Sequence, residues 1–600
     1  MSRLKEPISN RVWDIKYRYR RGEKVFDQTL EDTWQRVAKA VAQAEKSTER
    51  PFWKREFYRI LEDFRFLPGG RILAGAGTKY KVTLFNCFVM NIAKDSMKGI
   101  FHGLEEGALT LQQGGGVGYD FSVLRPFGAT AKKTGIQASG PVSFMRIWDS
   151  MAGVLLSTGA RRGAMMAVLR CDHPDVEAFV TAKKDPLELR HFNVSVMVSD
   201  AFMEAVKNDA DWPLIFPLGK ESVSGDIIYR QWGAALSPVP CRIYSIIKAR
   251  DLWKKIIRSA YDYAEPGVLF GDTINRMNNL WYRERLNATN PCGEIPLPSY
   301  GACNLGALNL TQFISAPFTA NAKIEWARID ETVKIATRFL DNVIDVSHYP
   351  LKMQRIQAMG TRRIGLGLTG LADTFVMLGI RYGSQESITL AQEIMKRMAE
   401  MTWRTSIQLA QEKGAFTFFA REYLQGPFVQ TLDGQIQREL AQYGVRNSHH
   451  NTIAPTGTTS LLANNVSNGI EPIFQAEYDR HVRTATETVI FHVKDYAYQR
   501  WLENNKERTR PPAWIDTNSL LPEAHLDIQG AMQPYIDNAI SKTINIPLDF
   551  PFEKLADVYT KAYALGLKGC TVFRPNPITG SVLETSHPEE SDVDLCCRVD

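Results

Sequence analysis

The chain has 600 residues, of which 44% are hydrophobic and 23% are charged, and its formal net charge at pH 7 is +6. These values are typical of a globular protein with a sizeable core, and the length exceeds that of one ordinary domain. There is no apolar run of about 18 residues and no signal-peptide core, so we expect a cytoplasmic protein without a membrane span. The charge is too mild and too dispersed to predict nucleic-acid binding.

The spacing of the cysteines bears on metal binding and on redox state. The eight cysteines include no Cys-x-x-Cys pair and no Cys/His cluster with zinc-finger spacing, so we predict no metal site. In a reducing compartment most of them should be free thiols, and a disulfide would be more typical of catalysis than of cross-linking.

The first 66 residues are expected to be helical. Apolar residues recur at helical spacing from Glu31 to Ala42, and a similar pattern follows from Phe52 to Phe66. Pro68 and the two glycines after it interrupt this pattern. Residues 84–89 then form a short apolar run that predicts a buried strand, so we place a domain boundary at residue 67.

Two loops in the next part of the chain have compositions suited to nucleotides. Residues 112–118 hold a glycine cluster that can turn N–H groups toward an anion, although a sharp structural turn explains it equally well. It lacks the Gly-Lys-Ser/Thr ending of a P-loop, which disfavours a Walker ATPase. Residues 157–166 include adjacent arginines, Arg161 and Arg162, which suit phosphates but are also common on a solvated surface.

The middle of the chain favours an α/β architecture. Strand-like and helical stretches alternate between residues 176 and 285, as in folds with parallel strands. Residues 362–370 contain Gly-x-Gly-x-x-Gly, but no second strand precedes an acidic residue at the required distance. We therefore reject a dinucleotide-binding fold for this segment.

Residues 290–298 are the most informative for chemistry. Their three prolines disfavour helix and predict an extended loop or a strand edge. Side chains alternate along an extended chain, so Asn290, Cys292 and Glu294 would share one face. A thiol beside a carboxylate and an amide suits a cysteine-centred reaction, whereas a buried cysteine in a Pro/Gly turn is the simpler interpretation.

A second polar segment and a tail complete the chain. Hydroxyl groups cluster over residues 455–460 before a probable helix, where they could bind an anion or only cap the helix. The adjacent His449 and His450 have poor geometry for a metal and are left unassigned. Residues 576–600 are rich in Pro, Ser, Glu and Asp, which predicts a flexible tail that ends near the vicinal Cys596 and Cys597.

The segment Asn290-Pro291-Cys292-Gly293-Glu294-Ile295-Pro296-Leu297, with Cys303-Asn304-Leu305 after it, resembles the active-site finger loop of ribonucleotide reductases. The residues of this motif are most similar to those of the adenosylcobalamin-dependent, class II branch. Further segments resemble the same family across nearly the whole chain. The resemblance implies a ten-stranded α/β barrel with a central finger loop over residues 67–575, preceded by the helical region 1–66. The implied activity is reduction of ribonucleotides, with diphosphates expected, to 2′-deoxyribonucleotides by thiyl-radical chemistry.

The same resemblance implies roles for single residues. Cys292 would carry the radical, Glu294 would be the general base and Asn290 would orient the substrate, while Cys87 and Cys303 would form the reducing pair. The implied substrate contacts are Asn86, Gly115, Gly116, Asn290, Pro291, Cys292, Gly293, Glu294, Pro455, Thr456, Gly457, Thr458 and Thr459. The implied allosteric nucleotide site comprises Asp95, Ser96, Arg125, Arg161 and Arg162.

The implied partners follow from the family as well. In relatives a C-terminal cysteine pair re-reduces the active site, so Cys596 and Cys597 are the expected shuttle, although their vicinal placement departs from the usual spaced pair. We expect dNTP or ATP effectors, a thioredoxin- or glutaredoxin-like reductant and a homodimer. Class I reductases usually begin with a further nucleotide-binding regulatory domain, and by the same resemblance this sequence starts after it, so we expect no separate ATP/dATP overall-activity site.

The radical source separates the branches of the family. Class I large subunits receive their radical through two adjacent tyrosines near the end of the barrel. This chain has Cys570-Thr571-Val572-Phe573 at that place, which favours adenosylcobalamin as a local source, although no Asp-x-His-x-x-Gly cobalamin signature occurs. Two alternatives stay open: a class I type large subunit with a separate radical-generating subunit, and a non-catalytic nucleotide-binding protein on this scaffold.

Overall fold

The computed structural model describes residues 3–92, 94–130, 135–155, 163–218, 226–483, 488–505, 509–575 and 583–584. The predictions for Arg161, Arg162, Cys596 and Cys597, and nearly all of the tail 576–600, lie outside these residues. Within the described ranges, no helix combines the length and the apolar composition needed to cross a membrane.

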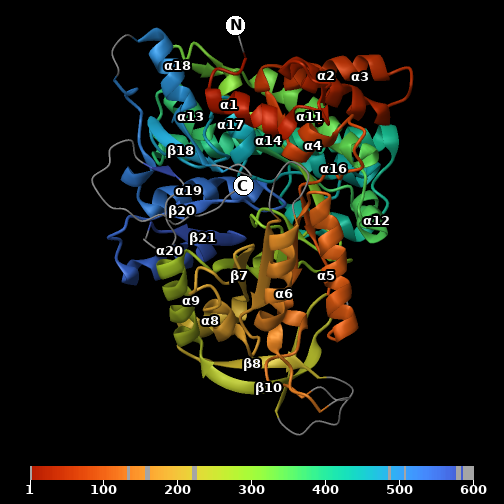
Figure 1. The fold of residues 1–600 in the computed structure, drawn as a ribbon, viewed down its shortest axis with the longest axis vertical. Helices are drawn as coiled ribbons and strands as arrows, with labels where there is room; N and C mark the ends of the chain where they lie inside the picture. The colour runs from red at the N-terminus through yellow and green to blue at the C-terminus, as the bar shows by residue number, and fades with distance from the viewer. Residues whose placement is uncertain are drawn as a thin grey trace.

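The N-terminal region is helical, as predicted, and it covers one end of the molecule (Figure 1). A capping box starts its second helix, because Thr29 accepts from the amide of Asp32 and the Asp32 carboxylate accepts from the amide of Thr29. A short hairpin of β1 (Arg20–Arg21) and β2 (Lys24–Val25) interrupts the helices, and β3 (Phe66–Pro68) begins at the end of the region. The helices are α1 (Pro7–Val12), α2 (Leu30–Val41), α3 (Arg50–Leu61) and α4 (Gly70–Gly75).

Five parallel strands form the first half of a barrel. They are neighbours in chain order: β4 (Cys87–Val89), β5 (Gly116–Asp120), β6 (Met165–Arg170), β7 (Phe192–Val198) and β11 (Gly267–Phe270). The helices of this half are α5 (Met97–Gln112), α6 (Gly140–Val154), α7 (Val176–Val180), α8 (Asp200–Lys207), α9 (Ala249–Tyr263) and α10 (Gly271–Arg276), and several of them fill the lower part of Figure 1.

Five further parallel segments form the second half. In spatial order they are β14 (Ala302–Asn309), β17 (Ile364–Thr369), the extended segment 449–453, β20 (Thr543–Asn545) and β21 (Gly569–Phe573). Parallel bridges from Leu366 to Asn451 and from Ile453 to Ile540 join the segment 449–453 to its neighbours. The helices of this half include α11 (Trp326–Val346), α12 (Lys352–Thr361), α13 (Leu371–Leu378), α14 (Gln385–Lys413), α19 (Pro522–Met532) and α20 (Phe552–Ala564).

The two halves close into a ring through two antiparallel seams. At one seam β4 pairs with β14, and at the other β11 pairs with β21. Two halves of five strands make the ten-stranded barrel, so this prediction is confirmed. The Gly-x-Gly segment lies in β17 as a barrel strand followed by α13, which agrees with the rejection of a dinucleotide-binding fold.

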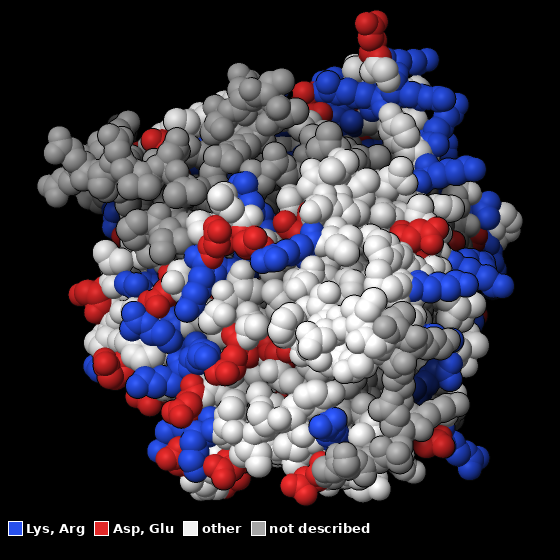
Figure 2. All heavy atoms as spheres, turned by 60° about the horizontal axis from the view of Figure 1, so that its bottom comes forward, with Lys and Arg blue, Asp and Glu red and all other residues white. Residues whose placement is uncertain are grey.

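Smaller elements surround the barrel. A three-stranded antiparallel sheet of β8 (Asp211–Pro217), β10 (Val239–Lys248) and β9 (Ile227–Arg230) lies at the lower end in Figure 1. Figure 2 turns this end forward and shows a broad uncharged area flanked by charged side chains. The other elements include β3 (Phe66–Pro68), β15 (Ile314–Ser315), β16 (Lys323–Ile324), α15 (Pro427–Gln430), α16 (Gly434–Tyr443), α17 (Gly457–Leu462), β18 (Glu477–Arg483), β19 (Thr488–Lys494), α18 (Tyr496–Asn504) and β22 (Leu583–Glu584).

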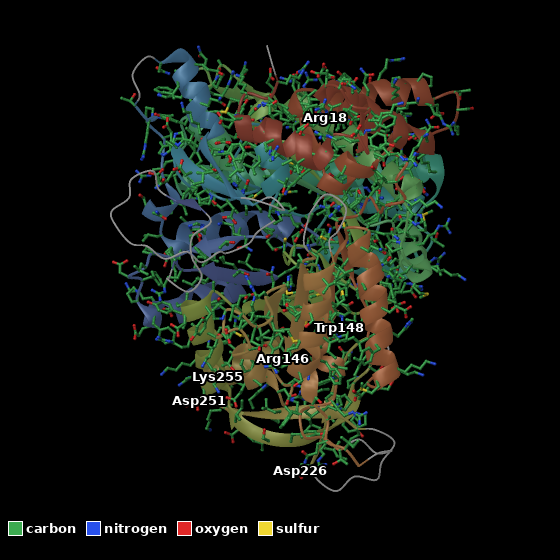
Figure 3. The ribbon with its side chains drawn as sticks, in the orientation of Figure 1. Arg18, Arg146, Trp148, Asp226, Asp251 and Lys255 are labelled. Atoms are coloured by element: carbon green, nitrogen blue, oxygen red, sulfur yellow. The ribbon has the colours of Figure 1, made fainter. Side chains whose placement is uncertain are left out.

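Aromatic side chains attach the outer helices to the barrel wall. Trp148 on α6, labelled in Figure 3, is fully buried and packs edge-on against Tyr119 and Phe121, with ring centroids 5.6 and 5.5 Å apart. Such edge-to-face pairs add to the stabilisation gained from burial of the rings. The outer face of β5 is therefore fixed by α6, which leaves its inner face for the barrel interior.

A hairpin fills the barrel interior. Its strands, β12 (Ala288–Thr289) and β13 (Pro296–Leu297), pair antiparallel, and their apolar residues pack with inward-facing side chains of both barrel halves. Gly118 on β5 makes room for it, because a Cβ there would lie 1.8 Å from the carbonyl oxygen of Thr289. The overlap would be with a main-chain atom of the hairpin, so rotation of a side chain could not relieve it.

We expect Gly118→Ala to displace the hairpin. The methyl group overlaps a main-chain oxygen, so the unfolding free energy should fall by about 1–3 kcal/mol and amide exchange over residues 288–297 should accelerate. Hydrogen exchange with mass spectrometry and chemical denaturation measure both effects. The matched control is Gly434→Ala on exposed α16, where the nearest atom to the new Cβ is 3.5 Å away. Unchanged protection of the hairpin in Gly118→Ala would contradict this packing.

Candidate active site

The tip of the hairpin, residues 290–294, is a tight turn. The amide of Gly293 donates to the carbonyl of Asn290 at 3.0 Å, and Gly293 has φ = +79°. The prediction of an extended loop is therefore wrong at the tip, and it holds only in the flanking strands β12 and β13. The physical reason is that Pro291 suits the second position of a β-turn, while Gly293 tolerates positive φ.

The turn brings three of the predicted catalytic groups together. Asn290 Nδ2 donates to Glu294 Oε2 at 2.7 Å and to Cys87 Sγ at 3.3 Å, while Asn290 Oδ1 accepts from the amide of Ile295 at 2.9 Å. Asn290 and Glu294 are buried. Cys292 is exposed at the tip. The amide and the carboxylate thus face one another because of the turn, and not because of strand alternation.

Burial controls the protonation of Glu294. Removal of its carboxyl group from water raises the pKa to about 7, against a smaller opposing effect of the hydrogen bond from Asn290. A carboxyl group with this pKa can both accept and return a proton near neutral pH. Glu294 therefore has the properties required of a general base.

The predicted reducing pair lies on the β4–β14 seam. Cys303 is directly opposite Cys87 in the antiparallel register. Residues in such positions have Cβ atoms about 4.5–5.5 Å apart and side chains on one face, close to the spacing that a disulfide spans. Burial raises the pKa of the Cys303 thiol far above its ordinary range, so this group stays protonated and can deliver hydrogen.

The polar loop after the segment 449–453 forms a candidate anion site. Thr456 has φ = +58°, and its hydroxyl bonds to Thr369 Oγ1 at 2.9 Å and to the amide of Gly469 at 3.0 Å. Pro455 to Thr458 are half-buried and Thr459 is buried; α17 begins at Gly457, where a Cβ would meet no atom within 4 Å. The first amides of a helix have no partner within the helix, so the amides of this turn can donate hydrogen bonds to phosphate oxygens.

The glycine cluster lies beside the hairpin tip. The amide of Gly116 donates to the carbonyl of Asn86 at 2.7 Å, and a Cβ on Gly116 would come within 3.1 Å of Pro291 Cγ. Gly115 is buried, and a Cβ on it would overlap the ring of Phe88. The cluster therefore lets β5 approach the tip closely, and it places Asn86 and Gly116 next to Cys87 and Pro291.

The described part of the predicted effector site is assembled at the start of α5. Arg125 Nε donates to Asp95 Oδ2 at 2.6 Å, and Arg125 also donates to the Asp95 carbonyl. Ser96 is the N-cap of α5 and accepts from the amide of Gly99 at 3.2 Å. These three residues are thus neighbours on the outside of the barrel, away from the tip.

The barrel wall beside the tip carries small, uncharged residues. Asn193, Ser195 and Gly267 lie on inward-facing positions of β7 and β11, and a Cβ on Gly267 would be 3.1 Å from both Ser195 Oγ and Thr571 Oγ1. Asn193 and Thr571 are exposed. Ser195 and Gly267 are buried, so this part of the wall combines two exposed and two buried neutral residues.

Two residues that hold the hairpin were missed in the sequence. Asn193 Nδ2 donates to the carbonyl of Pro291 at 2.9 Å, and Thr452 Oγ1 lies 2.9 Å from the carbonyl of Glu294. The available signal for Asn193 was that it alternates with apolar residues, as Ser195 does, on one face of the strand. Thr452 lies three residues before the polar loop at Pro455, and no local pattern identified its partner.

We expect the free energy of unfolding to fall as the pH rises, because the buried Glu294 carboxyl group resists ionisation. Because the folded-state pKa of about 7 exceeds the ordinary value of 4.5, this contribution is complete below pH 4.5 and is lost as the pH rises through 7. Glu294→Gln keeps the site neutral, so at pH 8 it should be up to about 3 kcal/mol more stable than the wild type, and equal to it at pH 4. Denaturant titrations at both values measure the difference.

Exposed Glu105 offers the control, since Glu105→Gln should have almost the same stability as the wild type at both pH values. A difference for Glu294→Gln that does not change between pH 4 and pH 8 would show that the carboxyl group titrates normally.

Comparison with known proteins gives the family of the chain. Residues 85–573 match the family described as ribonucleotide reductase, barrel domain, and residues 3–81 match ribonucleotide reductase, all-alpha domain. A vitamin B12-dependent ribonucleoside-diphosphate reductase of Mycobacterium tuberculosis is 37% identical over 92% of this chain and 76% of its own length. A protein of the same name from Thermoplasma acidophilum is 35% identical over 91% and 69%. A ribonucleoside-diphosphate reductase subunit alpha of Chlamydia pneumoniae is 26% identical over 92% and 57%. The chain therefore belongs to the ribonucleotide reductase family.

Proposed function

We propose that this chain is a ribonucleoside-diphosphate reductase that obtains its radical from adenosylcobalamin. The observation that carries the proposal is the contact of Asn290 with both Glu294 and Cys87 inside the barrel, with Cys303 opposite Cys87. The similarity to vitamin B12-dependent reductases over nine-tenths of the chain supports the same assignment.

Each residue of the site has a separate role in the proposed reaction. Cys292, as a thiyl radical, takes the hydrogen atom from C3′ of the ribose, and Glu294 accepts the proton of the 3′-hydroxyl group. The 2′-hydroxyl leaves as water after protonation by the Cys87–Cys303 pair. The two thiols supply two hydrogens in all and finish as a disulfide, Glu294 returns its proton, and Cys292 returns hydrogen to C3′. Ribonucleotide and dithiol thus give deoxyribonucleotide, disulfide and water.

The barrel interior excludes water from the general base and from its hydrogen-bond partner. Asn290 holds the Glu294 carboxyl group toward Cys87, and both polar side chains are buried, so water has little access to them. Exclusion of water strengthens the electrostatic interactions around Asn290 and Glu294.

The uncharged wall beside the hairpin tip suits the cofactor. When bound, adenosylcobalamin supplies a radical through homolytic cleavage of its cobalt–carbon bond. Asn193, Ser195, Gly267 and Thr571 are the residues that would lie against it, because they form the uncharged wall next to the tip. No adjacent tyrosine pair occurs at Thr571, which supports a local source over a relay from another subunit.

The remaining ligands follow from the placement of polar groups. Substrate phosphates would bind the loop Pro455–Thr459, whose first helical amides are open. A dNTP or ATP effector would bind at Asp95, Ser96 and Arg125, with Arg161 and Arg162 as further contacts.

We also propose a homodimer and a dithiol partner in the cytoplasm. Met97, Phe101 and Leu109 form an exposed apolar stripe on α5, next to the effector residues, as expected of an interface. A thioredoxin- or glutaredoxin-like protein would reduce the tail cysteines Cys596 and Cys597, which would in turn reduce the active-site disulfide.

The test is anaerobic turnover of CDP and CTP with a dithiol, with and without adenosylcobalamin. We expect deoxynucleotide only with the cofactor, and a preference for CDP. Product that requires a separate radical-generating protein would instead identify a class I large subunit. No deoxynucleotide under either condition would refute the proposal.

Two cysteine variants make the turnover assay specific. Cys292→Ser removes the radical-bearing thiol, so it should abolish turnover while nucleotide binding persists. Cys241→Ser changes a buried thiol in the outlying sheet, in β10, and should leave turnover unchanged.

A further inference from the structure

The main-chain carbonyl of Glu294 is held by two separate segments of the barrel wall. Thr452 Oγ1 lies 2.9 Å from this oxygen, and the amide of Ala539 donates to it at 2.9 Å. The Thr452 hydroxyl also lies 2.8 Å from the carbonyl of Ala539, so its single proton serves both carbonyls. The hydroxyl group therefore ties the finger hairpin to two neighbouring strand segments at once.

The surroundings of Thr452 leave its side chain little freedom. A Cβ on Gly365 would come within 2.6 Å of Thr452 Cγ2 and 3.2 Å of Cys303 Sγ, and a Cβ on Gly367 would come within 2.1 Å of the Thr452 carbonyl. Thr452 itself is only 1% exposed. Because the two glycines of β17 have no side chains, they leave room for Thr452 next to Cys303. Packing then fixes the direction of its hydroxyl group.

A buried carboxylate sets the position of both segments. Asp537 accepts hydrogen bonds from the amides of His450, Asn451 and Asn538, at 2.8–3.1 Å. Asn451 precedes Thr452 and Asn538 precedes Ala539, so one side chain orients the peptides on both sides of the Glu294 carbonyl. Burial of a carboxylate is costly unless its oxygens are bonded, and these amides provide the required bonds.

Lys568 completes this arrangement from the start of β21. Its ammonium group donates to the carbonyls of Asp537 and Asn538 and is buried. The positive charge partly balances Asp537 and restrains the same turn of the chain. The polar groups around Asp537 thus support the segments that hold the Glu294 carbonyl.

We propose that Thr452 and Asp537 are positioning residues for Glu294, which set where its carboxyl group meets the substrate hydroxyl. The inference rests on the proposed function, since it assigns Glu294 the role of general base. Neither residue touches the reacting atoms, and each acts through the main chain of the finger. A displacement of about 1 Å at a reacting group can lower a rate about a hundredfold, so a lost hydroxyl group far from the substrate can affect turnover.

The test compares Thr452→Val with Thr452→Ser. Valine has nearly the shape of threonine but no hydroxyl group, whereas serine keeps the hydroxyl. We expect kcat of Thr452→Val to fall ten- to a hundredfold with little change in KM for the substrate, and Thr452→Ser to stay within a few-fold of the wild type. Thr337→Val on α11 is the matched control, since its buried hydroxyl bonds only within its own helix, to Val333.

The pH dependence of kcat separates positioning from general destabilisation. Glu294 must be ionised to accept a proton, so kcat of the wild type should fall below a pH of about 7. The hydrogen bond from Asn290 favours the ionised form of Glu294, and displacement of the finger weakens that bond. The pKa of Glu294 should therefore rise, and the acid limb of Thr452→Val should move to higher pH. Asp537→Asn should move it in the same direction. Asp27→Asn changes a buried carboxylate of the N-terminal region and should leave it unmoved.

The outcomes distinguish this inference from the proposed function. If the wild type forms no deoxynucleotide, or shows no acid limb, the assigned reaction or the role of Glu294 fails. If the wild type turns over with an acid limb but folded Thr452→Val retains its kcat and pH profile, the positioning role is refuted. Thr452→Ala, which adds no atom to the crowded site, replaces the valine variant if that protein does not fold, and the same two results apply to it.

Discussion

The structure depends on one constraint: a hairpin lies inside a closed barrel, so its polar backbone groups must find partners on the barrel wall. The wall meets this need at defined points, where Asn193 donates to the Pro291 carbonyl, while Thr452 and Ala539 donate to that of Glu294. Each such bond also fixes a reacting group. The same hydrogen bonds therefore satisfy the buried backbone groups and position the side chains of the proposed site.

The architecture of two parallel halves has a direct chemical consequence. Parallel neighbours alone would place Cys87 and Cys303 on strands that run in one direction, whereas the antiparallel seam between β4 and β14 puts them directly opposite each other. The seam also lies beside the hairpin, since Asn290 donates to Cys87. In the proposed reaction, the dithiol and the carboxyl group would therefore act on one sugar without a large movement of either strand.

Much of this organisation could be predicted from local patterns. Apolar periodicity identified the helix α2 and the strand at Cys87, and the finger motif indicated the residues of the site. The conformation at the tip was not predicted correctly, because positive φ at Gly293 outweighed the extended preference of the prolines. The contact between Thr452 and Glu294 joins residues 158 positions apart, and such pairings depend on the closed barrel rather than on nearby sequence.

The pairing of Cys87 with Cys303 was implied only by the family resemblance, and the register now supplies its physical basis. It can be tested by a single turnover in protein that carries Cys596→Ser and Cys597→Ser, without external dithiol, followed by alkylation and peptide mapping. The account predicts one Cys87–Cys303 disulfide for each deoxynucleotide formed. Stoichiometric product with both thiols still open to alkylation would contradict it.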